Sequence, residues 1–294
     1  MGPAPVEAPA AVENSFIRFT ENDEGGKLET SITKYQNAAG VTVDLIGAVH
    51  LGDAAYYKGL NEAFKGYDVV LFELVGDPAA VQQPEGDAKA APKDATANML
   101  RGAQMMLTSM LQLQHQVDAI DYTAPNFVHA DLNWEQFRAL QKEKGESFTT
   151  LIRKTLQAQT AMQKEMKAAG KALPEDEGLG SLLALVGALR GSDTSALKLL
   201  LARQFKDAEA MMAKVEGPDG TVIIAERNKA ALKVMDDQLA AGHKRIGIFF
   251  GAGHFPDMEK RLGERGFGRM EYEWRTAWDI PKPAKAAPVK KAAE

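Results

Sequence analysis

Two nearly unbroken apolar runs, Val69–Val75 and Ile246–Phe250, constrain the fold of this chain more than any other feature. A strand with one face in water alternates apolar and polar residues, so an unbroken run predicts a strand covered on both faces, as in a parallel sheet. Before the first run, apolar residues from Tyr56 to Phe64 recur at helical spacing. A strand, a helix and a second strand in this order indicate a βαβ unit.

Further strand and helix signals place this unit in a larger α/β domain. Strands are predicted at residues 16–19, 30–35, 41–49, 68–75, 245–250 and 270–280, and helices at 56–64, 221–241 and 257–265. Asn37-Ala-Ala-Gly40 is a hairpin turn signal between the second and third of these strands. We therefore expect an α/β fold with a central mixed, largely parallel sheet flanked by helices and a long all-helical insertion.

The insertion is predicted from the different character of the middle of the chain. This segment is rich in Met, Leu, Ala, Gln and Lys, and helix patterns recur near 98–117, 133–144, 147–169, 180–190 and 193–214. The expected organisation is one discontinuous domain. It comprises a disordered tail at 1–14, a first α/β half at 15–97, a helical insertion or cap at 98–214, a second α/β half at 215–280 and a disordered tail at 281–294.

Charge and cysteine content exclude several classes of function. The chain of 294 residues has 35 Lys and Arg against 40 Asp and Glu, a net charge of -5, so its overall charge offers no attraction to nucleic acid. It has no Cys, which excludes disulfides, thiolate nucleophiles and Cys-ligated metal sites. No stretch of about 20 apolar residues predicts a transmembrane segment. The sequence signatures of P-loop, Rossmann and α/β-hydrolase sites are missing as well.

Three residues with chemically useful side chains follow the predicted strands. His50 comes after the strand at 41–49, Glu73 lies near the end of the next strand, and His254 comes after the strand at 245–250. In open α/β sheets the ligand crevice lies outside the carboxyl ends of the strands. Two imidazoles and a carboxylate are a known catalytic ligand set, so these residues are candidate ligands of manganese, cobalt or zinc. Each imidazole alone is also explained as a hydrogen-bonding residue at a strand end.

Arg227 lies on the apolar stripe of its predicted helix and needs an anionic partner there. That partner is a carboxylate such as Glu73 in a structural salt bridge, or a substrate oxyanion. The neighbouring Glu226 lies about 100° around the helix and is expected to pair at the surface. His129 and Asp131 have a His-x-Asp spacing that suits supporting or substrate contacts, although a loop leading into the next helix explains them equally well.

These motifs resemble those of the TraB/PrgY, GumN and Tiki proteins, within the wider erythromycin-esterase-like and ChaN-like superfamily. The matching residues, in the order of the family, are Gly47-Ala-Val-His50-Leu-Gly52, Phe72-Glu73, Glu226-Arg227-Asn228 and Gly251-Ala-Gly-His254. The resemblance covers parts of both α/β halves, whereas residues 98–214 carry no matching motif. The resemblance implies an α/β sandwich with a central sheet and a helical insertion.

In Tiki-like members the resemblance also implies a metal-dependent peptidase that uses manganese or cobalt. By this resemblance the candidate metal ligands or catalytic groups are His50, Glu73 and His254, with Arg227 as a clamp on the substrate or transition state and Glu226 and Asn228 beside it. Other branches of the superfamily bind haem or act as regulators. Fold analogy therefore does not decide the activity.

The leading hypothesis is a metal-dependent hydrolase that acts on a peptide or another small-molecule substrate. The metal would lower the pKa of a bound water and polarise a carbonyl, Glu73 would be a third ligand or the general base, and Arg227 would stabilise the oxyanion. The alternative is a non-enzymatic protein that binds a peptide or haem against the Met- and Leu-rich helices. The resemblance and the Ala- and Pro-rich ends favour an exported protein, periplasmic or extracellular, although the first residues lack the basic and apolar regions of a signal peptide.

Overall fold

The structure, a computed structural model, describes residues 15–82, 111–170, 194–205, 208–217 and 220–283. Its strands form a seven-stranded mixed sheet in the order β1-β2-β3-β8-β5-β7, and β9 pairs with β2. These strands are β1 (Ile17–Asn22), β2 (Gly25–Gln36), β3 (Thr42–Ala48), β5 (Val69–Phe72), β7 (Phe127–His129), β8 (Arg245–Gly251) and β9 (Gly268–Pro281). The expected α/β fold is therefore confirmed. Apart from residues 281–283, the predicted tails lie outside the described residues.

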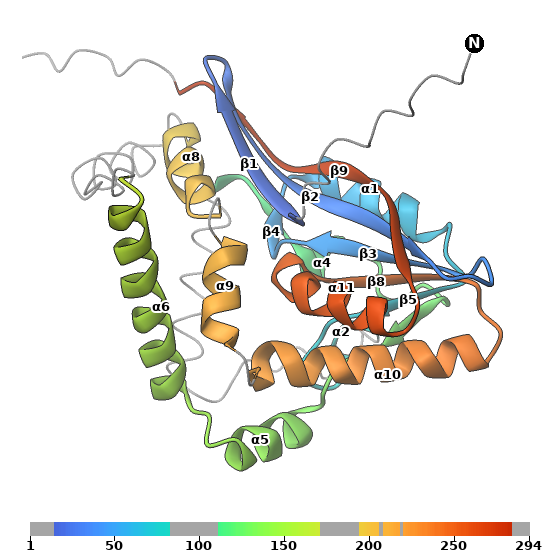
Figure 1. Cartoon of the computed structure of the whole chain (residues 1–294). Coiled ribbons are helices and arrows are strands. Elements are labelled where there is room, and N and C mark those ends of the chain that lie inside the picture. The colour runs from blue at the N-terminus through green and yellow to red at the C-terminus, as the bar shows by residue number, and fades with distance from the viewer. Residues whose placement is uncertain (1–14, 83–110, 171–193, 206–207, 218–219, 284–294) are drawn as a thin grey trace, which may run out of the picture.

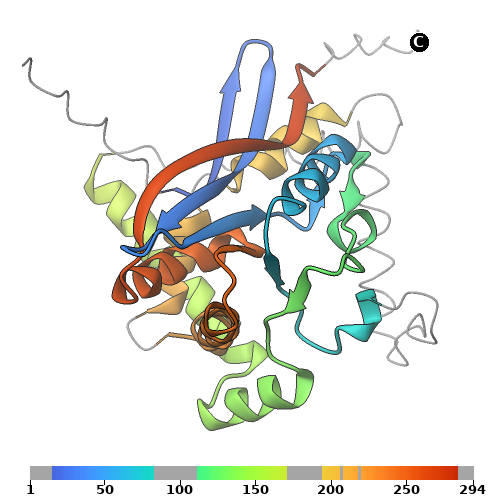
Figure 2. The same ribbon diagram turned by 90° about the vertical axis from the view of Figure 1, so that its right-hand side faces the viewer.

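Four strands run parallel, and they contain both apolar runs of the sequence. β3 pairs with β8, β8 with β5, and β5 with β7, all in parallel register. Helices cover both faces of this half, which is why β5 and the interior of β8 are buried. α1 (Ala54–Phe64) packs its predicted apolar stripe on one face, and α10 (Arg227–Ala240) and α11 (Phe255–Glu264) lie on the other (Figure 1, Figure 2).

The antiparallel half of the sheet joins the two ends of the described chain. The first part of β2 pairs with β1 and its second part with β3, while β9 runs antiparallel along the whole of β2. The predicted hairpin turn is confirmed, since the Asn37 side chain accepts hydrogen bonds from the backbone N–H groups of Ala39 and Val41, both at 3.0 Å. Because β2 and β9 are hydrogen-bonded neighbours, the two α/β halves of the sequence build one sheet.

The middle segment is not all helical, which corrects the expectation for residues 98–214. It contributes α4 (Gln116–Ala119), α5 (Trp134–Glu143), α6 (Phe148–Ala168), α8 (Ser195–Arg203) and α9 (Ala208–Glu216), but also β7 of the main sheet and β6 (Gln114–His115), which pairs with β4 (Leu51–Gly52). The helix expected up to residue 117 is wrong at 112–115, because Gln112 has a φ of 53° and leaves the helical path. The helix predicted at 180–190 lies outside the described residues.

Three helices of the middle segment stand at the side of the sheet toward which β3 points. They are α6, α8 and α9 (Figure 1). α9 packs close to the turn Ala252–His254 that follows β8, and an ion pair of 2.7 Å between Lys214 and Glu165 links it to α6. Among the described helices, none combines the length and the apolar character that crossing a membrane requires.

The helix predicted at 221–241 begins with an unusual turn. Val222–Glu226 forms a π-helical turn, η2, and regular α-helix starts only at Arg227. Glu216 at the end of α9 holds this turn by accepting hydrogen bonds from the backbone N–H groups of Thr221 at 2.8 Å and Ala225 at 3.0 Å. π-turns frequently mark functional sites, and this one ends directly at the arginine that the sequence analysis singles out.

Candidate functional site

Four polar side chains meet where the parallel strands end. Glu73 directly follows β5, Asp131 lies two residues after β7, and His254 follows β8 at the end of the 3-10 turn Ala252–His254. Arg227, the first residue of α10, reaches the same place from the covering helix. We call these four residues the strand-end cluster. The carboxyl ends of parallel strands are where open α/β sheets bind their ligands.

Arg227 is the centre of the strand-end cluster. Its Nη2 donates to Glu73 Oε1 and to Asp131 Oδ2, both at 2.6 Å, and its Nε donates to Asp131 Oδ1 at 2.9 Å. Its Nη1 has only longer contacts, 3.4 Å to the carbonyl oxygen of Ile223 and 3.4 Å to Nε2 of His254. Nη1 is therefore the nitrogen of Arg227 with the weakest hydrogen bonds to the described residues.

Glu73 is held as a fixed negative charge. Its Oε2 accepts the backbone N–H of Gly251 at 2.6 Å, and its Oε1 lies 3.5 Å from Nε2 of His254. Burial by itself raises the pKa of Glu73, but His254, Arg227 and the Gly251 N–H together outweigh it, so that this pKa lies well below its usual range. A carboxylate with so low a pKa is a weak proton acceptor.

Asn228 sets the orientation of His254. The Nδ1 atom of His254 lies 2.7 Å from Asn228 Oδ1, while the amide nitrogen of Asn228 donates to the His254 carbonyl at 2.9 Å and to Asp257 at 2.8 Å. Because that amide nitrogen is used as a donor, Oδ1 is the acceptor and Nδ1 carries the hydrogen. Neutral His254 then presents the lone pair of Nε2 to Arg227, and protonation at Nε2 would create a donor toward Glu73.

A cavity of about 150 Å³ lies beside the strand-end cluster, and we call it the strand-end cavity. Its lining residues are Glu73, Arg227, His50, Gln116 and Tyr122, with the aliphatic side chains of Leu74, Val75, Val81 and Val117. His50 is exposed, and within the described part of the chain its imidazole has no hydrogen-bond partner. The cavity therefore joins the buried charges to a histidine that solvent and substrate can reach.

Gln116 and Tyr122 add a hydrogen-bond acceptor and a donor to this cavity. The Gln116 amide nitrogen donates to the Tyr122 hydroxyl oxygen at 2.9 Å, and Gln116 Oε1 is buried without a partner among the described residues. Burial raises the pKa of Tyr122 to about 12, so its hydroxyl keeps its proton at neutral pH. A ligand that offers both a donor and an acceptor matches this pair.

The strand-end cluster as arranged does not fit the divalent metal that the family resemblance implies. Both oxygens of Glu73 already accept short hydrogen bonds from Arg227 and Gly251, and Nε2 of His254 faces the Arg227 guanidinium at 3.4 Å. A divalent cation on that imidazole would stand directly against a second cation. Across the residues that the structure describes, no three His, Asp or Glu side chains converge in a metal-binding arrangement.

The remaining residues singled out in the sequence lie around the strand-end cluster in different roles. His129 Nε2 forms a 2.7 Å hydrogen bond with the carbonyl of Leu74 and so supports the backbone next to Glu73. Glu226 lies apart from the cluster, paired with Lys144 at 2.7 Å and Lys229 at 2.9 Å. His50 reaches the cavity but not the cluster, and Asn228 supports His254.

The sequence pattern indicates Asp131 only as a supporting or substrate-contacting residue, and it does not indicate Gln116 or Tyr122 at all. Asp131 makes three of the hydrogen bonds of Arg227 and has a fully buried side chain with 0% exposure. The sequence feature that could have indicated Asp131 is the short apolar stretch Phe127-Val128. This stretch belongs to β7, so Asp131 follows a parallel strand just as Glu73 and His254 do. Gln116 begins the short helix α4 and Tyr122 lies in the turn that follows it, and neither residue is part of a recognisable sequence pattern.

Comparison with known proteins identifies the family. Residues 31–268 match the model of the TraB/PrgY/gumN family, a range that holds the whole strand-end cluster and the middle segment. No curated protein and no solved structure gives a significant match to the chain.

Proposed function

The chain belongs to the TraB/PrgY/gumN family, and we propose that it is a hydrolase that cleaves amide bonds, with peptides as its substrate class. The observation that carries this proposal is the set of polar groups around the strand-end cavity. A hydroxyl donor, an amide oxygen that no described residue pairs with, and an exposed imidazole lie there beside a buried charged cluster. Hydrolysis of a carbonyl compound needs a proton acceptor and groups that stabilise charge on the carbonyl oxygen.

The donor and acceptor of the cavity match the two sides of an amide group. The Tyr122 hydroxyl would donate to the carbonyl oxygen, and Gln116 Oε1 would accept the amide N–H. At about 150 Å³ the cavity admits one such group rather than a whole ligand, since small-molecule sites usually measure about 300–1,000 Å³. This supports a chain-like substrate that lies mostly outside the cavity, and it argues against a haem enclosed by the described residues.

His50 is the proton acceptor in this proposal. Water attacks the carbonyl carbon and gives its proton to the imidazole, which then passes the proton to the leaving amine nitrogen as the C–N bond breaks. Histidine suits this exchange near neutral pH. Glu73 does not, because its lowered pKa makes it a weak base.

Negative charge that develops on the carbonyl oxygen would be stabilised by the Tyr122 hydroxyl and by Nη1 of Arg227. Glu73 and Asp131 hold the guanidinium in place through Nε and Nη2, so Nη1 needs little reorganisation to serve the transition state. The buried cluster is in this way a preorganised electrostatic support rather than the source of the nucleophile.

A divalent metal is a separate proposal that rests on the family resemblance, and it requires Arg227 to move away from Glu73 and His254. Elemental analysis of protein purified without chelator, beside the His50→Ala/His254→Ala double variant, tests it. About one equivalent of manganese, cobalt or zinc that is lost from the double variant would support a metal site formed by rearrangement. If the metal-free protein retains activity, hydrolysis does not need the metal, and the roles of His50 and Tyr122 are sufficient for it.

The hydrolase proposal is tested by incubating the full chain with defined peptides and following cleavage by mass spectrometry. We expect His50→Ala to lower kcat by about 10²–10⁴-fold, the usual contribution of a general base. Tyr122→Phe removes one donor to the carbonyl oxygen and should lower kcat by about 10²-fold. The matched controls are His243→Ala and Tyr272→Phe, which change the same residue types outside the cavity.

Each result of this assay distinguishes between the hypotheses. Saturable peptide binding without cleavage would favour the non-enzymatic peptide-binding protein. Cleavage that proceeds at the normal rate in His50→Ala would contradict the assignment of His50 as the base. Equal losses in the variants and in their controls would indicate a general effect on folding.

A further inference from the structure

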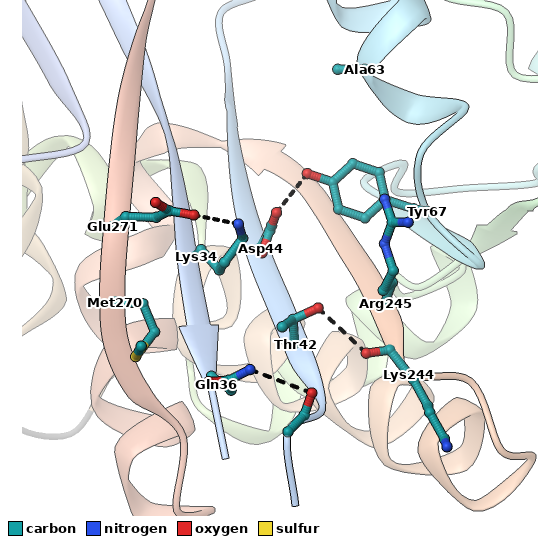
Figure 3. A pocket seen from close by; sticks show the side chains of 11 residues that line it. Lys34, Gln36, Thr42, Asp44, Ala63, Tyr67, Lys244, Arg245, Met270 and Glu271 are labelled. Carbon is teal, nitrogen blue, oxygen red and sulfur yellow. Dashed lines mark hydrogen bonds and ion pairs between the residues drawn. The ribbon is translucent and has the colours of Figure 1, made fainter. Parts of the chain in front are cut away.

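A second polar pocket lies at the opposite end of the parallel strands, where β3 and β8 begin (Figure 3). It has a volume of about 670 Å³, and we call it the amino-end pocket. The side chains that matter for its chemistry are Lys34, Asp44, Tyr67, Lys244, Arg245 and Glu271. It shares no lining residue with the strand-end cavity, so the proposed hydrolysis does not explain it.

Asp44 is the strongest sign that the amino-end pocket binds a ligand. Its residue is only 7% exposed, and Tyr67 donates a hydrogen bond of 2.8 Å to its Oδ2. Its Oδ1 is buried and has no hydrogen-bond partner among the described residues. A buried carboxyl oxygen without a donor destabilises a fold unless a ligand supplies that donor. Burial accordingly raises the pKa of Asp44, although the Tyr67 hydrogen bond opposes the shift.

Cations surround Asp44 on its neighbouring strands. Lys34 of β2 lies directly opposite Asp44 in the register and forms an ion pair with Glu271 of β9. Arg245 begins β8 and lies beside the ring of Tyr67 in Figure 3. Its exposed guanidinium donates no hydrogen bond to any residue that the structure describes.

The net charge of the pocket follows from these residues together with Lys244. Among the lining residues, three cations, Lys34, Lys244 and Arg245, face the two carboxyl groups of Asp44 and Glu271, which leaves an excess of one positive charge when both carboxyls are ionised. Asp68, outside the lining, accepts the backbone N–H groups of Lys244 and Arg245 and lowers the positive charge behind them. An anionic ligand is therefore favoured.

We propose that the amino-end pocket binds a small polyhydroxylated anion, a sugar phosphate or a sugar acid, with its oxyanion on Arg245 and a hydroxyl donating to Oδ1 of Asp44. Arginine is well suited to binding both phosphate and carboxylate. The donor to Asp44 is a hydroxyl rather than an ammonium group, because an ammonium would stand against Lys34 directly across the strand pair. The pocket volume lies within the usual range of small-molecule sites.

Two glycines keep this pocket in shape. A Cβ atom at Gly247 would lie 3.3 Å from the Tyr67 ring, and one at Gly66 would lie 3.0 Å from Nη2 of Arg245. Without side chains at these positions, the ring packs on the sheet and the guanidinium packs on the chain after α1. The Tyr67 ring, whose hydroxyl donates to Asp44, is thereby positioned before a ligand binds, which lowers the entropic cost of binding.

Isothermal titration calorimetry of the full chain with glucose 6-phosphate and with glucuronate tests the proposal and distinguishes the two oxyanions. We expect at least one of them to bind with a Kd below about 1 mM, and about tenfold more tightly than glucose or inorganic phosphate alone. Asp44→Asn and Arg245→Gln should each weaken that binding about tenfold or more. Lys142→Gln, which removes an exposed cation from α5, should leave it unchanged.

The proposal is overturned if neither anion saturates the protein at about 10 mM, or if glucose binds as tightly as the anions. It is also overturned if Asp44→Asn and Arg245→Gln, shown to be folded by circular dichroism, bind with normal affinity. Peptide cleavage should persist in Asp44→Asn, because Asp44 lies at the other end of the strands from the strand-end cavity. A failed titration therefore leaves the proposed hydrolase function untouched.

Discussion

The chemistry of single residues in this protein depends on which hydrogen-bond and ion-pair partners each buried charged group has. Arg227 faces two carboxylates and a histidine, and each of its three nitrogens has a contact within the protein. Asp44, in contrast, has a donor for only one of its two oxygens within the described part of the chain. Buried polar atoms need partners, so the first arrangement makes a rigid site and the second leaves an acceptor that the proposed ligand would use.

At this scale we predict a pH-dependent contribution of Glu73 to stability. Its pKa is lowered from 4.5 in the folded protein, so the folded state favours the ionised form. The stabilisation is therefore complete above pH 4.5 and is lost as the pH falls below that value. In urea unfolding, the free-energy gap between the wild type and Glu73→Gln should be constant near neutral pH and should narrow in acid.

Glu135→Gln is the matched control for this measurement, because it removes an exposed carboxylate from the first turn of α5. Its stability should run parallel to that of the wild type at every pH. If the difference in the free energy of unfolding between the wild type and Glu73→Gln stays constant down to pH 3, the ion pairs of Glu73 do not favour its charged form.

At the scale of elements, the functional groups lie where strands end and where the helix α10 begins. Each parallel strand ends in an irregular segment, and the π-turn η2 leads directly into Arg227. Glu216 binds this turn through three donors, the N–H groups of Thr221 and Ala225 and the hydroxyl of Thr221. A helix of the middle segment thus fixes the start of α10, which connects that segment to the site.

We predict that Glu216→Ala lowers the free energy of unfolding by about 1–3 kcal/mol, because it leaves three donors at a helix start without their acceptor. It should also lower peptide cleavage, since Arg227 follows the turn that Glu216 holds. Glu62→Ala is the control, because Glu62 forms an exposed ion pair with Lys65, and such pairs contribute little to stability. Equal stability of the two variants in urea unfolding would contradict the role of Glu216.

At the scale of the whole molecule, β9 ties the end of the described chain to its beginning. It pairs with β2 over the full length of that strand, and it buries Ala277, Trp278 and Ile280 in the common core. The middle segment also enters the main sheet through β7. Because of these connections, we expect the described parts of the chain to unfold together in one cooperative transition, and not as a core with a helical cap that unfolds independently.

We predict that Ile280→Ala destabilises the whole protein by about 2–5 kcal/mol, because Ile280 is only 1% exposed and its truncation leaves a cavity. Loss of helix, followed by far-ultraviolet circular dichroism, should coincide with the change in tryptophan fluorescence in both wild type and variant. Trp134 on α5 and Trp278 on β9 together report on both parts of the molecule. Two separate transitions would instead indicate that the middle segment unfolds on its own.

The buried strands, the βαβ unit around α1 and the order of the family motifs all follow from the amino-acid sequence alone. These features are local, since a nearly unbroken apolar run such as Val69–Val75 predicts a strand covered on both faces wherever it lies in the chain. The same locality explains why β7 was missed, because its three residues form a strand only by pairing with β5 at the edge of a formed sheet.

Which side chains come into contact depends on the arrangement of the strands and helices in space. Arg227 lies 96 residues from Asp131 and 154 residues from Glu73, and these side chains come together only because β5 and β7 are neighbours under α10. His50 and His254 follow the paired strands β3 and β8, yet one imidazole is exposed and the other is buried, since the chain after each strand turns in its own way. The periodicity of apolar residues in the sequence indicates which face of a helix or strand is covered. The order of the strands and the path of the turns are properties of the whole fold.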